Sequence, residues 1–299
     1  MDELTSAGIL DPVLRASYAE CKRLNAEHGK TYFLATLLLP KAKRPFVHAL
    51  YGFARYADEI VDDLSSQHDR GARSDQLHKW SQAMLASLKN GRSDDPLGMA
   101  LIDTASRFEI PHKYFEAFLN SMTMDLCIKE YDTFDQLMEY MYGSAAVIGL
   151  EMTHVLGAKS SDALESAKKL GIAFQLTNFI RDVSEDLDRG RIYLPLDELK
   201  LHGVKREMLE RKVLTPEIVA ALKDQISRVR SLQEEARNGI LLLPEESRPG
   251  ILAATEMYCG IVDAVEANNY NIFTSRARVP GSRKAKIMLR AYAQKAFAH

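Results

Sequence analysis

Cysteine is scarce in this sequence: three occur among 299 residues, far apart at positions 21, 127 and 259. An odd number of widely spaced thiols forms neither a disulfide framework nor a thiolate metal site, so the expected compartment is a reducing cytoplasm. Net charge is also small, because 39 basic and 41 acidic residues leave −2. A nucleic-acid binder with a wholly basic surface is therefore excluded, and no nucleic-acid partner is expected.

Long hydrophobic runs are missing as well. The longest, such as residues 33–39 and 240–243, are far shorter than the ~20 residues that span a bilayer. The first ten residues contain Asp2 and Glu3 and do not join a basic start to an apolar stretch, so no signal peptide is expected. Glycine-rich loops of the P-loop or Rossmann type are absent too, and NAD(P)H is not an expected cofactor.

Proline is infrequent, with ten residues that leave long tracts uninterrupted. These tracts are rich in Ala, Leu, Glu, Lys, Met and Arg, and their apolar residues recur at intervals of three and four, as at Phe115, Phe118 and Met122. No linker or repeat divides the chain, so residues 1–299 are expected to form one all-α domain. The predicted helices are 9–28, 43–64, 72–90, 97–108, 112–129, 134–156, 161–187, 216–241, 246–270 and 282–297. The predicted loops are 65–74, 91–96 and 190–203.

One acidic stripe is predicted on the helix over residues 43–64. Because a helix turns by about 100° per residue, four polar residues share one narrow stripe beside the apolar face. These residues are Tyr51, Arg55, Asp58 and Asp62. Glu59 and Asp63 point further toward solvent.

A second stripe is predicted on the helix over residues 161–187. The same rotation aligns polar residues at the edge of an apolar face. They are Gln175, Asn178, Asp182 and Asp186. Arg181 and Glu185 fall on the opposite flank.

Two such stripes together indicate a cation site, although each alone could be a solvated surface. Like-charged carboxylates repel and lose hydration beside an apolar face, so the arrangement is unfavourable unless a cation neutralises it. Carboxylates and one amide suit Mg²⁺, which commonly completes its shell with substrate phosphates, and Mn²⁺ could replace it. Arg55 and Arg181 could hold the remaining phosphate oxygens. The stripes therefore predict a magnesium site for a diphosphate.

Two other interpretations compete with this one. Glu109–His112 and Glu151–His154 have the Glu-x-x-His spacing of di-iron bundles, but Pro111 interrupts the first pair and the stripes stay unexplained. His154 is interpreted instead as a core or capping histidine. The second alternative is a non-catalytic all-α scaffold, which predicts no saturable thermal stabilisation by Mg²⁺ with pyrophosphate.

Two long motifs carry a family resemblance. The first is YGFARYADEIVDD over residues 51–63, and the second is QLTNFIRDVSED over 175–186, which continues as LDRGRIYLP over 187–195. Shorter matches are HGKTY at 28–32, MDL at 124–126, YGSAAVIG at 142–149, Tyr258, and FTSR at 273–276. Over nearly its whole length the chain resembles the phytoene and squalene synthase family of head-to-head isoprenoid synthases, and most of all its bacterial phytoene synthase branch.

The resemblance implies an all-helical isoprenoid synthase fold with a central cavity, across whose mouth the two acidic helices face each other. It assigns the metal to Asp58, Asp62, Asn178, Asp182 and Asp186. It assigns catalysis to Asp58, Asp62, Asp182, Asp186, Tyr51 and Arg55. It assigns substrate binding to His28, Gly29, Lys30, Thr31, Tyr51, Arg55, Gln175, Arg181, Tyr193, Tyr258 and Arg276.

Residues 28–31 are expected to close over one diphosphate. Two positions depart from the family pattern: Gly29 replaces a frequent serine and Glu59 replaces a frequent aspartate. Neither lies on the metal-binding stripes. Aromatic and small residues are expected to line the cavity or to belong to the plain core, namely Tyr32, Phe33, Tyr142, Ala145, Ala146 and Phe174.

The resemblance also implies a reaction. Two geranylgeranyl diphosphates would join through a cyclopropyl diphosphate to give phytoene, with loss of diphosphate and of a proton. Two farnesyl diphosphates, giving dehydrosqualene or squalene, are the alternative, because the sequence does not show cavity depth. No feature of the sequence indicates the oligomeric state.

The carboxyl-terminal segment is basic. After Glu266 no acidic residue occurs, and the segment contains Arg276, Arg278, Arg283, Lys284, Lys286, Arg290 and Lys295. A solvated helix face is one interpretation. The other is a peripheral contact with the inner face of the membrane by an otherwise cytoplasmic enzyme, since substrate and product are apolar.

Overall fold

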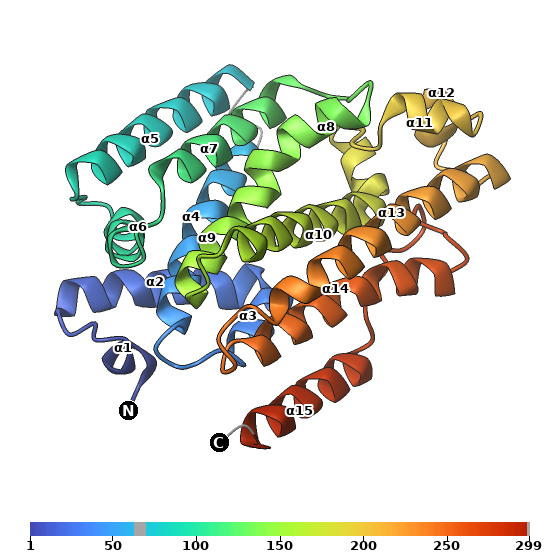
Figure 1. Cartoon of the computed structure of the whole chain (residues 1–299). Coiled ribbons are helices and arrows are strands. Elements are labelled where there is room, and N and C mark those ends of the chain that lie inside the picture. Colours follow the sequence, from blue (N-terminus) through green and yellow to red (C-terminus); the bar gives the residue numbers. More distant parts are fainter. Residues whose placement is uncertain (63–69, 298–299) are drawn as a thin grey trace.

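The computed structural model describes residues 1–62 and 70–297, and over these residues the protein is all-α, as predicted (Figure 1). An isolated parallel bridge joins Glu130 and Ile192. The helices are α1 Glu3–Ser6, α2 Pro12–His28, α3 Lys30–Thr36, α4 Arg44–Asp62, α5 Arg70–Asn90, α6 Pro96–Arg107, α7 His112–Cys127, α8 Phe134–Met141, the π-helical η1 Tyr142–Ala146, α9 Val147–Leu156, α10 Ser161–Asp188, α11 Leu196–Leu201, α12 Arg206–Glu210, α13 Pro216–Ile240, α14 Arg248–Ala267 and α15 Gly281–Phe297.

Helices α2, α6 and α13 begin with a capping pattern that can be recognised in the sequence. Proline occupies the first position of α2, α6 and α13, where its missing N–H costs nothing. The residue before each proline accepts a backbone hydrogen bond through its side chain. These caps are Asp11, Asp95 and Thr215. The helices therefore begin within a few residues of the predicted positions.

Helix α10 lies at the centre of the molecule, with α9 and α13 beside it (Figure 1). Its apolar residues enter all three core clusters: Leu176 and Ile180 pack with α8 and α13, Phe174 packs with α3, α14 and α15, and Ala163 belongs to the third cluster. The third cluster joins α2, α4, α6 and α7. Because α10 is surrounded, Asp182 and Asp186 near its carboxyl end face other helices rather than open solvent. No described helix is both long and apolar enough to cross a membrane.

Several segments differ from the prediction, among them the short helices α1, α3 and α12, which were not predicted. The helix predicted over 134–156 is interrupted by the π turn η1, where Gly143 approaches α7 so closely that a Cβ would lie 2.1 Å from the Ala117 carbonyl oxygen. The predicted loop 190–203 contains the short helix α11, which starts after Pro195. The predicted loop 65–74 lies largely outside the described residues, and α5 already begins at Arg70.

One carboxyl group is buried in the core without a partner. Glu151 on α9 is fully buried, and neither of its carboxylate oxygens has a hydrogen bond within the described part of the chain. Burial raises the pKa of Glu151 well above its usual value of 4.5. The native protein therefore holds this carboxyl in its protonated form, because an unpaired buried charge is far more costly.

The variant Glu151→Met is expected to be more stable than the parent by about 1–3 kcal/mol at pH 8, because it removes an unsatisfied buried polar group. The unfolded state releases the Glu151 proton above a pH of about 4.5, whereas the native state keeps it, so parental stability falls as pH rises. Urea unfolding at pH 5 and pH 8 measures both effects. The variant should show a weaker fall, while Glu116→Met, at an exposed position on α7, should keep the parental slope. Equal slopes for Glu151→Met and the parent would contradict this account.

Candidate functional site

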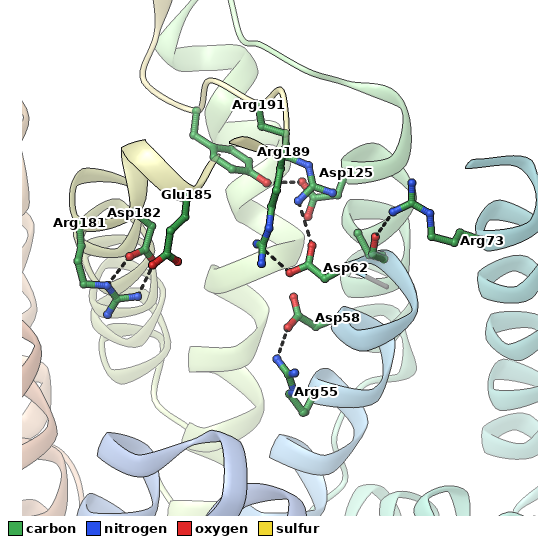
Figure 2. A network of polar contacts seen from close by, with 12 residues as sticks. Arg55, Asp58, Asp62, Arg73, Asp125, Arg181, Asp182, Glu185, Arg189 and Arg191 are labelled. Atoms are coloured by element: carbon green, nitrogen blue, oxygen red, sulfur yellow. Dashed lines mark hydrogen bonds and ion pairs between the residues drawn. The ribbon is translucent and has the colours of Figure 1, made fainter. Parts of the chain in front are cut away.

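Acidic residues of α4 and α10 face each other near the carboxyl ends of both helices (Figure 2). Asp58 and Asp62 come from α4, and Asp182 and Asp186 come from α10. The loop that follows α10 passes between these helices and brings two arginines to the gap (Figure 2). The structure therefore brings the two predicted stripes to one place. Asp63, also predicted near the first stripe, lies outside the described residues.

On α4 every acidic side chain is matched by a cation. The Arg55 guanidinium contacts Asp58 Oδ2 at 2.7 Å and Glu59 Oε1 at 3.0 Å. Asp62 binds the Nη1 atoms of Arg189 at 2.9 Å and Arg191 at 3.2 Å. Arg189 and Arg191 were not among the predicted site residues, because helical periodicity relates only residues within one helix.

On α10 the two aspartates differ in their surroundings. Asp182 accepts hydrogen bonds from Arg181 Nε at 2.7 Å and from Arg276 Nε at 2.8 Å. Arg181 was predicted on the opposite flank, but its long side chain bends back to Asp182. Asp186 is only 9% exposed, and among the described residues no hydrogen bond or ion pair reaches its carboxylate. Arg276 also approaches Glu185, at 3.5 Å.

The pKa values follow these surroundings. Desolvation and then the charge of Asp62 raise the pKa of Asp58 to about 6, although Arg55 opposes them. Burial and then the charge of Asp182 raise the pKa of Asp186 to about 8. Burial alone would raise the pKa of Asp182, but Arg181 and Arg276 outweigh it and lower that pKa. Each stripe thus contains one carboxylate, Asp58 or Asp186, whose neighbouring arginines do not offset the effects of burial and of the adjacent aspartate.

A buried hydrogen-bond network around Asp125 lies next to the α4 stripe. Asp125 on α7 is 6% exposed and accepts hydrogen bonds from the hydroxyls of Tyr140 and Tyr193, both at 2.7 Å. Burial raises the pKa of Asp125, and the charge of Arg191 lowers it. Tyr193, predicted to bind substrate, therefore holds Asp125 with its hydroxyl, and its ring stacks on Phe179. Asp125 matched a motif in the sequence, but its partners could not be inferred there.

A cluster of four cations lies beside the α10 stripe. Lys284 on α15 reaches Thr31, with 3.2 Å between Nζ and Oγ1. Burial lowers the pKa of Lys284, and the neighbouring charges of Arg181, Arg278 and Lys30 lower it further. The sequence assigned Lys284 and Arg278 only to the basic tail, whereas the structure turns Lys284 inward. Mutually repelling cations of this kind are a site for a polyanion.

The predicted lid residues 28–31 join α2 to α3 at this cluster. His28 Nε2 lies 3.5 Å from Glu59 Oε1, which ties the segment to α4. Gly29 approaches α4 so closely that a Cβ would lie 2.7 Å from the Tyr51 ring. The departure from the family pattern at Gly29 therefore has a local reason: the site has no room for a side chain.

Burial raises the pKa of Tyr51 to about 12.

An apolar cavity, partly open to solvent, extends along α10 from the acidic stripe. At one end it is lined by Gln175 and Asn178, where Asn178 Nδ2 donates weakly to Gln175 Oε1 at 3.4 Å. At the other end it is lined by apolar residues of four helices, of the α3–α4 connection and of the α13–α14 turn. These are Leu39, Leu156, Ala163, Ile240, Leu243 and Ile251.

Half of the residues predicted as candidate cavity lining face the cavity. Tyr32, Ala145 and Phe174 do. The others are in different places: the Phe33 ring stacks on His48, Tyr142 is 43% exposed, and Ala146 is buried with residues of α8 and α10. Tyr258 is buried against Phe174, with ring centroids 4.3 Å apart.

The structure does not support the di-iron alternative. Glu109 is an exposed residue that pairs with Lys159, and His154 Nδ1 lies 3.2 Å from the carbonyl oxygen of Phe108, which ends α6. His154 is therefore a capping histidine, as interpreted from the sequence.

The carboxylates of α4 and α10 are the candidate ligands for a divalent cation. Over residues 1–62 and 70–297, no three His, Cys, Asp or Glu side chains converge as ligands of one ion. The facing stripes nevertheless fit such an ion, because Asp186 is a buried carboxylate that makes no hydrogen bond or ion pair with the described residues, and Asp182 adds a second negative charge next to it. The individual site roles stay predictions.

Comparison with known proteins agrees with these observations. The model of the squalene/phytoene synthase family matches residues 25–283. Phytoene synthase 2, chloroplastic, of Solanum lycopersicum is 37% identical over 288 residues, which cover 94% of this chain and 92% of the relative. The 15-cis-phytoene synthase of Synechococcus elongatus is 35% identical over 283 residues and covers 91% of each chain.

Solved structures share the fold. A dehydrosqualene synthase in complex with a ligand has a TM-score of 0.86 at 28% identity, covering 94% of this chain and 96% of that one. The squalene synthase HpnC of Alicyclobacillus acidocaldarius has a TM-score of 0.80 at 23% identity, covering 89% and 99%. At that identity the second similarity shows the fold alone. The predicted isoprenoid synthase fold is confirmed.

Proposed function

The chain belongs to the squalene/phytoene synthase family and is a prenyl-transferring enzyme of the phytoene synthase type, and we propose that it joins two geranylgeranyl diphosphates head to head. The observation that carries the choice of substrate is the apolar cavity that begins at the acidic stripes. We further propose that one domain, residues 1–299, contains the whole site, since α10 contributes to both the stripes and the cavity wall.

The depth of the cavity favours a twenty-carbon chain. Asn178 and Ala163 both line it, and at 1.5 Å per residue they lie ~22 Å apart along α10. A peptide chain extends by about 3.5 Å over three bonds, so the sixteen main-chain carbons of a geranylgeranyl group reach ~18 Å and the twelve of a farnesyl group ~13 Å. The longer chain fills the cavity, whereas the shorter one leaves its far end empty.

The residues that would hold Mg²⁺ or Mn²⁺ are Asp58, Asp62, Asn178, Asp182 and Asp186. Such a cation, when bound, draws negative charge from the departing diphosphate. Oxygen ligands of this kind usually bind Mg²⁺ together with substrate phosphates, which agrees with carboxylates divided between two helices.

The protein groups around the stripes would serve the charged and apolar parts of the substrate separately. Lys30, Arg181, Arg278 and Lys284 offer hydrogen bonds to the diphosphate oxygens. Tyr32 and Phe174 present rings at the start of the cavity, with the Tyr258 ring packed against both, and aromatic faces attract cations. The apolar wall excludes water, which would otherwise capture a carbocation.

The proposed reaction has two stages. In the first, the carbon–oxygen bond of one substrate breaks, its electron pair leaves with the diphosphate, and the double bond of the second substrate attacks the allylic cation. Loss of a proton gives a cyclopropyl diphosphate. In the second stage this intermediate ionises, rearranges and loses a proton to give phytoene.

Incubation with Mg²⁺ and each prenyl diphosphate tests the function directly. Extraction and mass analysis should find a forty-carbon polyene from geranylgeranyl diphosphate. A thirty-carbon product from farnesyl diphosphate alone would move the substrate to the dehydrosqualene or squalene class. No product from either, together with no thermal stabilisation by Mg²⁺ and pyrophosphate, would favour the scaffold interpretation.

We also propose a peripheral membrane contact through the outer face of α15. Leu289 is 71% exposed and Tyr292 is 47% exposed, one turn apart on the same face, and Lys286 is exposed beside them. No acidic residue follows Glu266, so this face suits anionic lipid headgroups. An amphipathic helix of this kind lies in the membrane interface and does not span it.

The variant Leu289→Glu is expected to bind anionic vesicles about tenfold more weakly, because it places a negative charge at the lipid surface. Co-sedimentation with vesicles containing phosphatidylserine measures the change. Leu201→Glu, at an 84% exposed leucine on α11, is the matched control and should bind as the parent does. Parental binding that is weak and indifferent to salt would count against the proposed contact.

A further inference from the structure

The loop that follows α10 is fixed to the connection between α7 and α8. The Ile192 N–H donates to the Lys129 carbonyl oxygen at 2.8 Å, and the Leu196 N–H donates to the Tyr131 carbonyl oxygen at 3.0 Å. These bonds hold the loop beside the carboxyl end of α7, where Asp125 lies.

Asp125 and Asp62 share one cation of this loop, Arg191. Arg191 Nη1 lies 3.2 Å from Asp62 Oδ1, and the guanidinium also lies close to Asp125 (Figure 2). Burial alone would lower the pKa of Arg191, but nearby anionic groups, which include Asp125 and Asp62, raise it. Arg191 is only 7% exposed. The two carboxylates therefore compete for the same buried charge.

Positive charge is in excess around Asp62. A small hollow beside it is lined, among the described residues, by two acidic and four basic ones. Arg189 also binds Asp62, at 2.9 Å, so both carboxylate oxygens of Asp62 contact an arginine. Without the charge of Asp125, Asp62 would face the four cations alone. The six charged residues of the hollow are Asp62, Arg73, Asp125, Lys129, Arg189 and Arg191.

Asp125 is not itself placed to bind a metal ion. Its Oδ1 accepts a hydrogen bond from the Tyr193 hydroxyl and its Oδ2 accepts one from the Tyr140 hydroxyl, both at 2.7 Å. The residue is 6% exposed. A buried carboxylate whose oxygens are both occupied acts on the stripe through its charge, and Arg191 is the group that it shares with Asp62.

We propose that Asp125 is a positioning residue that holds part of the charge of Arg191, so that the Asp62 carboxylate stays able to bind a divalent cation. The inference rests on the proposed function, in which Asp62 is a metal ligand. A carboxylate that two arginines neutralise attracts a cation weakly, and the same arginines repel that cation. In a partly buried site, one nearby unit charge changes an affinity by about tenfold or more.

The test is Asp125→Asn, which removes the charge and keeps the shape. Thermal shift at a fixed pyrophosphate concentration with increasing Mg²⁺ measures binding without turnover. The Mg²⁺ concentration for half-maximal stabilisation should rise about tenfold, with each protein compared with its own melting temperature without metal. With geranylgeranyl diphosphate the Mg²⁺ dependence of turnover should shift equally, and kcat at saturating Mg²⁺ should stay within about threefold. A purely structural aspartate would instead lower kcat at every Mg²⁺ concentration.

Arg191→Gln tests the route of the effect. This variant should need less Mg²⁺ than the parent, because one competing cation leaves Asp62. Adding Asp125→Asn to it should then change the Mg²⁺ requirement by less than about twofold, since the residue through which Asp125 acts is absent. A tenfold rise in that background as well would overturn the role given to Arg191, and so would an Arg191→Gln protein that needs more Mg²⁺ than the parent.

The matched control is Asp103→Asn on α6. Asp103 also accepts a hydrogen bond from a tyrosine hydroxyl, that of Tyr18 at 2.7 Å, and pairs with Arg107 at 2.8 Å, but it does not line the hollow. This variant should keep the parental Mg²⁺ requirement. A parental requirement in Asp125→Asn would contradict the inference alone. A parent that Mg²⁺ and pyrophosphate do not stabilise would contradict the proposed function, and the inference with it.

Discussion

Asp182→Asn is expected to reduce turnover of geranylgeranyl diphosphate by about a thousandfold or more, since it removes a charge on which two arginines and the proposed cation depend. Asp182 accepts hydrogen bonds from Arg181 and Arg276 and lies one turn from the buried Asp186. Asparagine has the same shape without the charge. Steady-state kinetics measures the loss, and thermal shift in Mg²⁺ with pyrophosphate measures binding separately: the stabilisation seen for the parent should disappear.

Asp188→Asn is the matched control for this variant. Asp188 ends the same helix, but its side chain is 70% exposed and pairs with Lys212 outside the stripe. It should keep parental turnover. If Asp182→Asn were fully active, the metal assignment on α10 would be wrong. If it lost activity only because it melts far below the parent, the stripe would be structural.

Ala167→Phe is expected to reverse the preference of the enzyme for chain length. Ala167 lines the cavity between the acidic stripe and its far end, and only ~16 Å of α10 separates it from Asn178. A phenyl ring in the empty space would leave room for a farnesyl chain but not for a geranylgeranyl chain. Formation of the forty-carbon product should fall by about a hundredfold, while the thirty-carbon product is kept or increased. Competition between the two substrates, followed by mass analysis, gives the ratio.

Ala163→Phe provides a graded comparison. Ala163 is one helical turn deeper and lines the same cavity, so the added ring shortens it less. The ratio of forty-carbon to thirty-carbon product should therefore fall from the parent through Ala163→Phe to Ala167→Phe. If both variants kept the parental ratio, the cavity along α10 would not be the site of the prenyl chain.

The course of the helices was largely predictable because capping residues and apolar periodicity act locally. Asp95 with Pro96 and Thr215 with Pro216 fix helix starts through bonds within a few residues. The π turn η1 was not predictable, since it depends on how closely Gly143 packs on α7. Helix α3 was also missed: it is seven residues long and follows α2 directly at Gly29, so it adds little periodic pattern of its own.

The site was predictable only in part, for the same reason. Rotation of about 100° per residue groups Asp58 with Asp62 and Asp182 with Asp186, because each pair lies on one helix. Arg191 and Asp62 meet across 129 positions of sequence, and Lys284 and Thr31 across 253. No periodicity relates such residues. They come together only when the core around α10 has formed.

The cavity along α10 also means that the core of this protein is incomplete by itself. Side chains such as Ile240, Leu243 and Phe174 border empty space on one side and lack the dispersion contacts that a filled interior provides. In the proposed function a prenyl chain would supply these contacts, so that the substrate would pack as an additional core element. Its tail, which takes no part in bond formation, supplies binding energy that holds the reacting end in place. The surface that stabilises the fold and the surface that selects the substrate are therefore the same.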